Sequence, residues 1–92
     1  MAASADGAVS RTVQIKDIDF HPARLVVHRG DRVTWRFLDE EVSHNVTSVA
    51  KPRFRSSGSR MTGTYSVRFT RKGTYRYVCT IHANMRGRIV VR

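Results

Sequence analysis

The chain has 92 residues, a hydrophobic content of 40% and a formal net charge of +10 at pH 7. This length supports one domain with a modest core, and no apolar run approaches the roughly 20 residues that a membrane-spanning helix needs. The excess of arginine favours an acidic partner. Because the basic residues are scattered along the chain, a nucleic-acid-binding protein is disfavoured. Residues 1–9 are expected to form a flexible tail, and residues 10–92 a single domain.

The first half of the domain alternates apolar and polar residues, which is the period of half-buried β-strands. A first strand is predicted around Val13 and Ile15. A second is predicted over residues 25–28 and a third over residues 33–37, with a turn at residues 30–31 between them.

The same alternation continues in the second half. A fourth segment is predicted to start near Ser43, and further strands are predicted over residues 65–69, 75–79 and 89–91. Residues 50–63 are rich in Gly, Ser and Pro, and are predicted to form a long connection. About seven to eight short strands at this spacing indicate an all-β, two-sheet Greek-key β-sandwich.

The chain contains a single cysteine, Cys79, which therefore has no internal disulfide partner. In the predicted strand its side chain points the same way as Tyr75 and Tyr77, into the core. It begins the pattern C-x-x-H-x-x-M with His82 and Met85. An electron-transfer copper site needs two imidazoles and a thiolate near one plane, with a weak axial thioether. The pattern supplies the thiolate, the thioether and one of the two imidazoles.

His44 is the candidate for that imidazole, because it opens the fourth segment, where a sandwich can bring it to the loop after the cysteine. The acidic residues 39–41 before it are interpreted as a solvated turn, and His21 and His28 as surface residues that bind no metal. Each candidate also has a structural interpretation, as a small core residue, a loop histidine or a gap-filling methionine. Their joint presence on a sandwich pattern favours the metal.

On these residues the sequence resembles the cupredoxins, the small type 1 blue copper proteins, from about Thr12 to Val91. The order of that family's motifs is followed by the segments FHPARLVVHRGDRVTWRF, SHNVTS, FRSSG and TYSVRFTRKGTYRYVCTIHANMRGRIVV. The short spacing between His82 and Met85 is most similar to the amicyanin branch.

The resemblance implies one type 1 copper ion held by four side chains: His44 and His82 through Nδ1, the Cys79 thiolate and, as the long axial contact, the Met85 thioether. It also implies that Asn45 ties the two ligand segments together. The Asn45 backbone N–H is expected to donate to the Cys79 sulfur, and its side chain to reach Thr80.

Electrons are expected, from the same resemblance, to pass through the exposed edge of His82. The docking surface is expected around it, at Ile81, Ala83, Asn84 and Arg86. Ile81 stands where amicyanins usually have proline, and Ala83-Asn84 where a bulkier and more apolar pair is common. These departures leave the expected ligand set intact and bear on the reduction potential, the docking surface and the rigidity of the loop.

The predicted function is that of a one-electron carrier cycling between Cu(II) and Cu(I), and not of an enzyme, because four ligands leave no open position for a substrate. We expect a monomer with an acidic redox partner, such as a dehydrogenase or a c-type cytochrome, and neither nucleic acid nor a membrane span. The expected location is the periplasm or another extracytoplasmic space, as a free protein or a soluble domain of an anchored one.

Three alternatives remain open at this point. The first is a copper storage or delivery protein with the same ligands. The second is a basic β-domain that binds single-stranded nucleic acid, with Tyr75 and Tyr77 as stacking platforms. The third is a zinc site, for which a thioether is a poor ligand.

Overall fold

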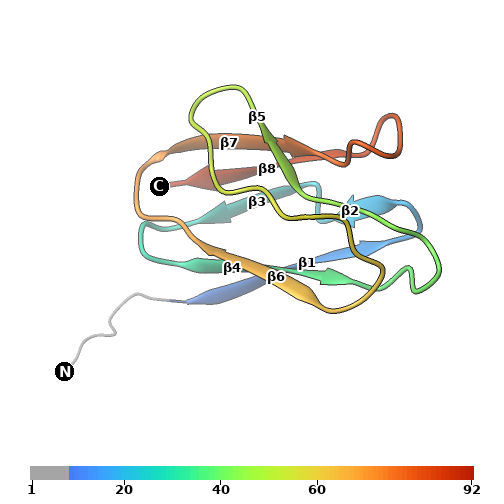
Figure 1. Cartoon of the computed structure of the whole chain (residues 1–92). Coiled ribbons are helices and arrows are strands. Elements are labelled where there is room, and N and C mark those ends of the chain that lie inside the picture. Colours follow the sequence, from blue (N-terminus) through green and yellow to red (C-terminus); the bar gives the residue numbers. More distant parts are fainter. Residues whose placement is uncertain (1–8) are drawn as a thin grey trace.

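The computed structural model describes residues 9–92 as eight β-strands in two four-stranded sheets (Figure 1). Sheet A has the strand order β2-β1-β4-β6. Its strands are β1 (Ser10–Lys16), β2 (Asp19–His21), β4 (Arg32–Phe37) and β6 (Thr64–Arg68). Sheet B has the order β3-β8-β7-β5. Its strands are β3 (Arg24–Val27), β5 (Thr47–Val49), β7 (Gly73–Val78) and β8 (Arg86–Val91). The predicted two-sheet β-sandwich is confirmed.

Both sheets are mixed. In sheet A, β1 runs antiparallel to β2 and parallel to β4, which in turn runs antiparallel to β6. In sheet B, β8 runs parallel to β3 and antiparallel to β7, which pairs antiparallel with β5. The two sheets lie face to face, so each buries one side of its strands between them (Figure 1).

The core is formed by the residues that the alternation placed on the inner faces. They include Val13, Ile15, Val33, Trp35, Phe37, Tyr75, Tyr77, Cys79, Ile89 and Val91, all of which are buried. The ring of Tyr77 packs edge-on against Phe20 and against Trp35, with centroid distances of 4.7 and 5.3 Å. Because Tyr75 and Tyr77 are core residues, neither offers a stacking surface to a nucleic acid.

The long connection between β5 and β6 also contributes to this core. Residues 50–63 contain no strand, as predicted, apart from an isolated bridge at Arg60. Phe54, within this connection, stacks on Trp35 with nearly parallel rings and a centroid distance of 5.7 Å. The connection therefore follows the sandwich closely and covers part of its interior.

Two local features differ from the prediction. Strand β2, which carries the exposed His21, was not predicted; it pairs with β1 through a turn in which Asp17 and Ile18 both have positive φ angles. Strand β5 is shorter than the segment predicted from Ser43 onward, since it begins only at Thr47. The predicted tail lies outside the described residues except for Val9, whose backbone bonds to Asp31 and Arg32.

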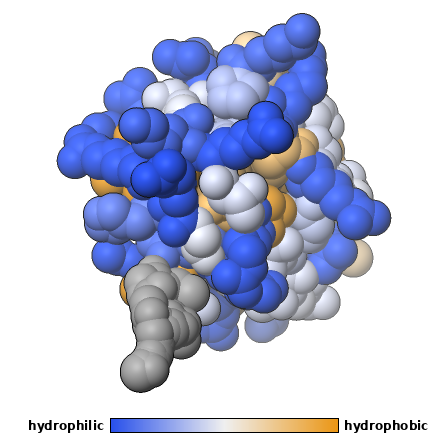
Figure 2. All heavy atoms as spheres, turned by 90° about the vertical axis from the view of Figure 1, so that its left-hand side faces the viewer, coloured by the Kyte–Doolittle hydropathy of each residue, from blue (hydrophilic) through white to orange (hydrophobic). Residues whose placement is uncertain are grey.

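The loop between β7 and β8 and the segment between β4 and β5 lie at the same end of the sandwich, on the right of Figure 1. Figure 2 shows the opposite end, where hydrophilic side chains predominate and only small apolar areas show between them. None of the described residues forms a helix that could cross a membrane.

Candidate metal centre

Three potential ligand side chains meet at the end of the sandwich where the β7–β8 loop lies. His44 comes from the segment before β5, and Cys79 and His82 come from the β7–β8 loop. One ligand atom from each lies within 4.8 Å of the other two. Cys79 and His44 are buried, and His82 is half-buried. The structure therefore brings together side chains that are 35 positions apart in the sequence.

The spacing of these atoms fits a metal ion between them. Sγ of Cys79 lies 3.8 Å from Nδ1 of His44. Metal bonds of about 2.0 Å to nitrogen and about 2.3 Å to sulfur, opened to about 120°, place the two donor atoms about 3.7 Å apart, close to the observed separation. A thiolate and two imidazoles are the in-plane donors of an electron-transfer copper site. The donor set and its spacing thus fit copper.

The orientation of the His44 ring is fixed by its second nitrogen. Nε2 of His44 lies 2.8 Å from the Oδ2 atom of Asp39, to which it donates a hydrogen bond. In the tautomer that donates from Nε2, the atom that faces Cys79, Nδ1, is the one available to a metal. The backbone of His44 is held as well, by a reciprocal pair of hydrogen bonds with Arg60 at 2.9 Å.

His82 is oriented in the same way. Its Nε2 atom lies 3.2 Å from the backbone oxygen of Ser43, which can only accept a hydrogen bond. The Nδ1 atom of His82 is thereby left for a metal. The two imidazole rings lie 4.8 Å apart between centroids and are tilted by 56°. Both histidines thus have Nε2 engaged with the protein, and ligation of a metal through Nδ1 stays a prediction.

Met85 closes the ligand loop. Its backbone oxygen accepts a hydrogen bond from the N–H of Cys79 at 3.0 Å, so the two ends of the loop are joined where β7 and β8 begin to pair. Asn84 has a φ angle of 67°, a conformation that asparagine tolerates better than most residues. Met85 is 2% exposed, and it lines the same hollow as Cys79 and His82, which places a thioether in the interior beside the cluster.

Asn45 connects the two segments that carry the ligands. Its Nδ2 donates to Oγ1 of Thr80 at 2.8 Å, and its Oδ1 accepts the N–H of Thr80 at 3.0 Å. Oδ1 also accepts the hydroxyl of Thr47, and Nδ2 donates to the Ser59 hydroxyl at 3.3 Å. The side-chain contact with Thr80 is the one that the resemblance implied. The donation from the Asn45 backbone to the Cys79 sulfur stays a prediction.

Asp39 is a functional candidate that sequence reasoning missed. We interpreted it as part of a solvated turn, and for Asp39 that interpretation is wrong, because its carboxylate binds His44 and also accepts the backbone N–H groups of Asp17 and Ile18. Burial tends to raise the pKa of Asp39, but these hydrogen bonds outweigh it and hold the pKa below its usual value. In the sequence, the only signal for this role was the position of a carboxylate five residues before the candidate ligand His44.

The candidate docking residues surround the cluster on the outside. Ile81 is 48% exposed, and Ala83, Asn84 and Arg86 are exposed as well. The exposed side chain of Ile81 is one of the few large apolar groups that the described residues present to solvent. These residues therefore form a mixed apolar and polar rim directly beside His82.

An eight-stranded sandwich with a largely buried His-Cys-His cluster and a neighbouring methionine defines a small copper protein with the cupredoxin fold. The family model of copper binding proteins, plastocyanin/azurin family, matches residues 7–92. The chain belongs to this family, and its cofactor is copper.

Individual relatives agree with this assignment. The amicyanin of Paracoccus denitrificans is 38% identical over 95% of this chain and 67% of its own length. A solved structure of a variant amicyanin in its Cu(I) form is 38% identical, with a TM-score of 0.79 over 97% of this chain and 86% of that one. A copper-containing nitrite reductase from Thermus scotoductus is 27% identical, with a TM-score of 0.77, but this chain covers only 24% of it.

Proposed function

We propose that the chain is a type 1 copper protein that carries single electrons between redox proteins, with His44, Cys79, His82 and Met85 as the copper ligands. The observation that carries the proposal is the 3.8 Å contact between Cys79 Sγ and His44 Nδ1, with Nε2 of the same ring held by Asp39. Copper, when bound, supplies the Cu(II)/Cu(I) couple. The protein's part is to keep one ligand arrangement through both oxidation states.

The donors and their supports suit that task. A thiolate and a thioether favour Cu(I), and imidazole binds both oxidation states. The bonds from Asp39 and Ser43 hold the rings of His44 and His82, and Asn45 holds the two segments together. Because these supports fix the positions of the ligand side chains, little has to move when an electron is gained or lost.

Catalysis and copper delivery are both less favoured by this arrangement. Four protein ligands leave no position for a substrate, and the relative that is an enzyme contains much more chain than this one. His44, Cys79 and Met85 are each less than 5% exposed, so an acceptor protein could not reach them without opening the sandwich. We therefore propose a carrier and not an enzyme, with storage or delivery as the second candidate.

The location and partners follow from the same proposal. We propose a periplasmic or other extracytoplasmic monomer that exchanges electrons through the edge of His82. Its partner is proposed to be an acidic redox protein, such as a dehydrogenase or a c-type cytochrome, because the chain has a net charge of +10.

Addition of one equivalent of Cu(II) to the metal-free protein tests the ligand assignment. The proposal expects an intense blue thiolate-to-copper charge-transfer band that is reversibly bleached by a one-electron reductant. Cys79→Ala should abolish the band while circular dichroism reports an intact sandwich. A colourless wild type, or an equally blue variant, contradicts the assignment. Rapid release of Cu(I) to a metal-free acceptor protein would favour delivery instead.

A further inference from the structure

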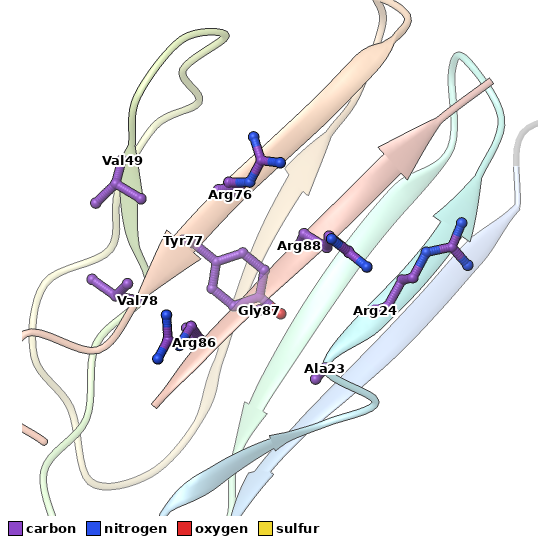
Figure 3. A pocket seen from close by; sticks show the side chains of 9 residues that line it. All are labelled: Ala23, Arg24, Val49, Arg76, Tyr77, Val78, Arg86, Gly87 and Arg88. Atoms are coloured by element: carbon purple, nitrogen blue, oxygen red, sulfur yellow. The ribbon is translucent and has the colours of Figure 1, made fainter. Parts of the chain in front are cut away.

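Three arginines lie in one row across the outer face of sheet B. The register pairs Arg24 of β3 with Arg88 of β8, and Arg88 with Arg76 of β7. Directly paired residues project from the same face of a sheet. All three side chains are exposed, and Figure 3 shows them side by side on neighbouring strands. This set, Arg24–Arg88–Arg76, is the arginine row.

No ion pair within the described residues stabilises the arginine row. Like charges that face each other on adjacent strands destabilise a sheet. No strand of sheet B contains Asp or Glu, and every acidic residue of the chain precedes Val42. Over residues 9–92, none of the three arginines forms an ion pair. Within residues 9–92 no acidic side chain compensates the repulsion, and carboxylates from another molecule would offset it.

Apolar side chains lie next to the row on the same face. Val49 pairs with Arg76, and Val78 follows two residues later on β7; both are half-buried. The three arginines and these valines line a shallow hollow of about 460 Å³ (Figure 3). Arginine beside apolar surface is typical of the centre of a protein–protein interface.

A single-stranded nucleic acid is less well matched to this face. Such ligands stack their bases on exposed aromatic rings. The aromatic residues of β7, Tyr75 and Tyr77, project inward, where they are 6% and 1% exposed. The chemistry of the face therefore favours a protein surface that carries carboxylates.

The arginine row is continuous with the ligand loop. Arg76 precedes Cys79 by three residues and Arg88 follows Met85 by three, which is about 10 Å along each strand. Val78 and Arg86 line both the hollow at the row and a second hollow at the ligand loop. A partner seated on the row would therefore also reach the rim around His82.

We propose that the arginine row docks a carboxylate-rich surface of the redox partner and so places that partner's redox centre beside the ligand loop. The identity of the partner as a redox protein rests on the proposed function. Charge complementarity of this kind acts mainly on the association rate, and its effect falls as salt screens it.

The test compares two triple variants of the copper-loaded protein. The row variant is Arg24→Gln, Arg76→Gln and Arg88→Gln. The matched control is Lys16→Gln, Arg32→Gln and Arg36→Gln, which removes the same charge from exposed positions of sheet A. Each protein is reduced and mixed in a stopped-flow instrument with an oxidised acidic c-type cytochrome, over a range of ionic strength.

At low ionic strength the row variant should react on the order of tenfold more slowly than wild type, with a flatter salt dependence, while the control slows much less. Equal slowing of both variants, or no slowing of the row variant, overturns the proposal. It is also overturned if the row variant keeps its cytochrome rate but loses binding to a fluorescent single-stranded oligonucleotide.

Oxidation of the reduced protein by tris(phenanthroline)cobalt(III) distinguishes the proposed electron-carrier function from the proposed docking role of the arginine row. A wild type that fails to reduce this small complex contradicts electron transfer itself. A wild type that reduces it normally, together with unchanged cytochrome rates in the row variant, contradicts only the arginine row.

Discussion

The Asp39 carboxylate accepts a hydrogen bond from Nε2 of His44 at 2.8 Å and from the backbone N–H groups of Asp17 and Ile18 at 2.8 and 2.9 Å. One side chain thus joins the β1–β2 turn of sheet A to the buried histidine of the metal centre. The turn needs this support, because both of its central residues adopt positive φ angles without being glycine. The orientation of His44, a proposed ligand, therefore depends on the β1–β2 hairpin, which contributes no proposed ligand.

Replacement of Asp39 by Asn should weaken copper binding. The amide can accept from His44 but carries no charge and can present its NH₂ group instead, so the His44 tautomer is less firmly set. Loss of such a supporting bond typically costs 10–100-fold in metal affinity. Competition titration against a copper chelator measures the change. Glu40→Gln removes the same charge from an exposed neighbour and should leave the affinity close to wild type.

Replacement of Met85 by Gln should lower the reduction potential. An amide oxygen is a harder donor than a thioether and stabilises Cu(II) relative to Cu(I). A tenfold change in the ratio of the affinities for Cu(I) and Cu(II) corresponds to a shift of about 59 mV in the potential of this one-electron couple. Cyclic voltammetry of the copper-loaded variant measures the shift. A potential equal to or above that of wild type would show that Met85 is not a ligand.

Replacement of Gly87 by Ala should destabilise the sandwich. A Cβ atom at this position would lie 2.5 Å from both Cζ and Oη of Tyr77. The Tyr77 ring cannot yield easily, because it is 1% exposed and packs against Phe20 and Trp35. Overpacking of this kind costs about 1–3 kcal/mol.

Denaturant unfolding of the metal-free protein measures that cost. Gly58→Ala is the matched control, since an added Cβ there meets nothing within 4 Å, and its stability should change by less than about 0.5 kcal/mol. Equal stability of both variants would mean that the Tyr77 ring can move aside.

Protonation of the Asp31 carboxylate should make the protein less stable in acid. Burial tends to raise the pKa of its carboxyl group, but hydrogen bonds from the N–H groups of His28 and Val9, at 2.8 and 2.9 Å, outweigh it and hold the pKa below its usual value. A pKa that is lower in the folded state contributes stability above the unfolded value of about 3.9, and this stability is lost as the pH falls through the folded value.

Asp31→Asn should therefore lower the free energy of unfolding by about 1 kcal/mol at pH 7. The difference from wild type should shrink as the pH is lowered below about 4, because the wild-type carboxylate then becomes protonated. Urea unfolding at a series of pH values measures both proteins. A difference that stays constant down to pH 2 would mean that the charge of Asp31 plays no part.

The strands that alternate strictly were predicted well from the sequence. Val33, Trp35 and Phe37 are all buried, as their period of two requires, and Cys79 continues the buried face of β7. The approach of His44 to the cysteine also followed from the pattern, since His44 lies in the segment just before β5 and Cys79 lies just after β7.

The remaining features depend on contacts that no local pattern encodes. Strand β2 was missed because its turn, Asp17-Ile18, lacks the glycine or asparagine that usually marks positive φ angles, and Asp39 supplies the stabilisation from a distance. The role of Phe54 on Trp35 was missed for a related reason, because it lies in a connection that looks polar by composition.

The hydrogen bond from the Cys79 N–H to the Met85 oxygen has an evolutionary consequence. It joins the ends of the ligand loop, and below it β7 and β8 pair in unbroken register from Val78 and Arg86 onward. Residues 80–84 can thus be exchanged, lengthened or shortened while the framework stays as it is. One of the four proposed ligands, His82, lies within this interchangeable part, and Cys79 and Met85 lie at its two ends, so selection can retune the site through a few codons.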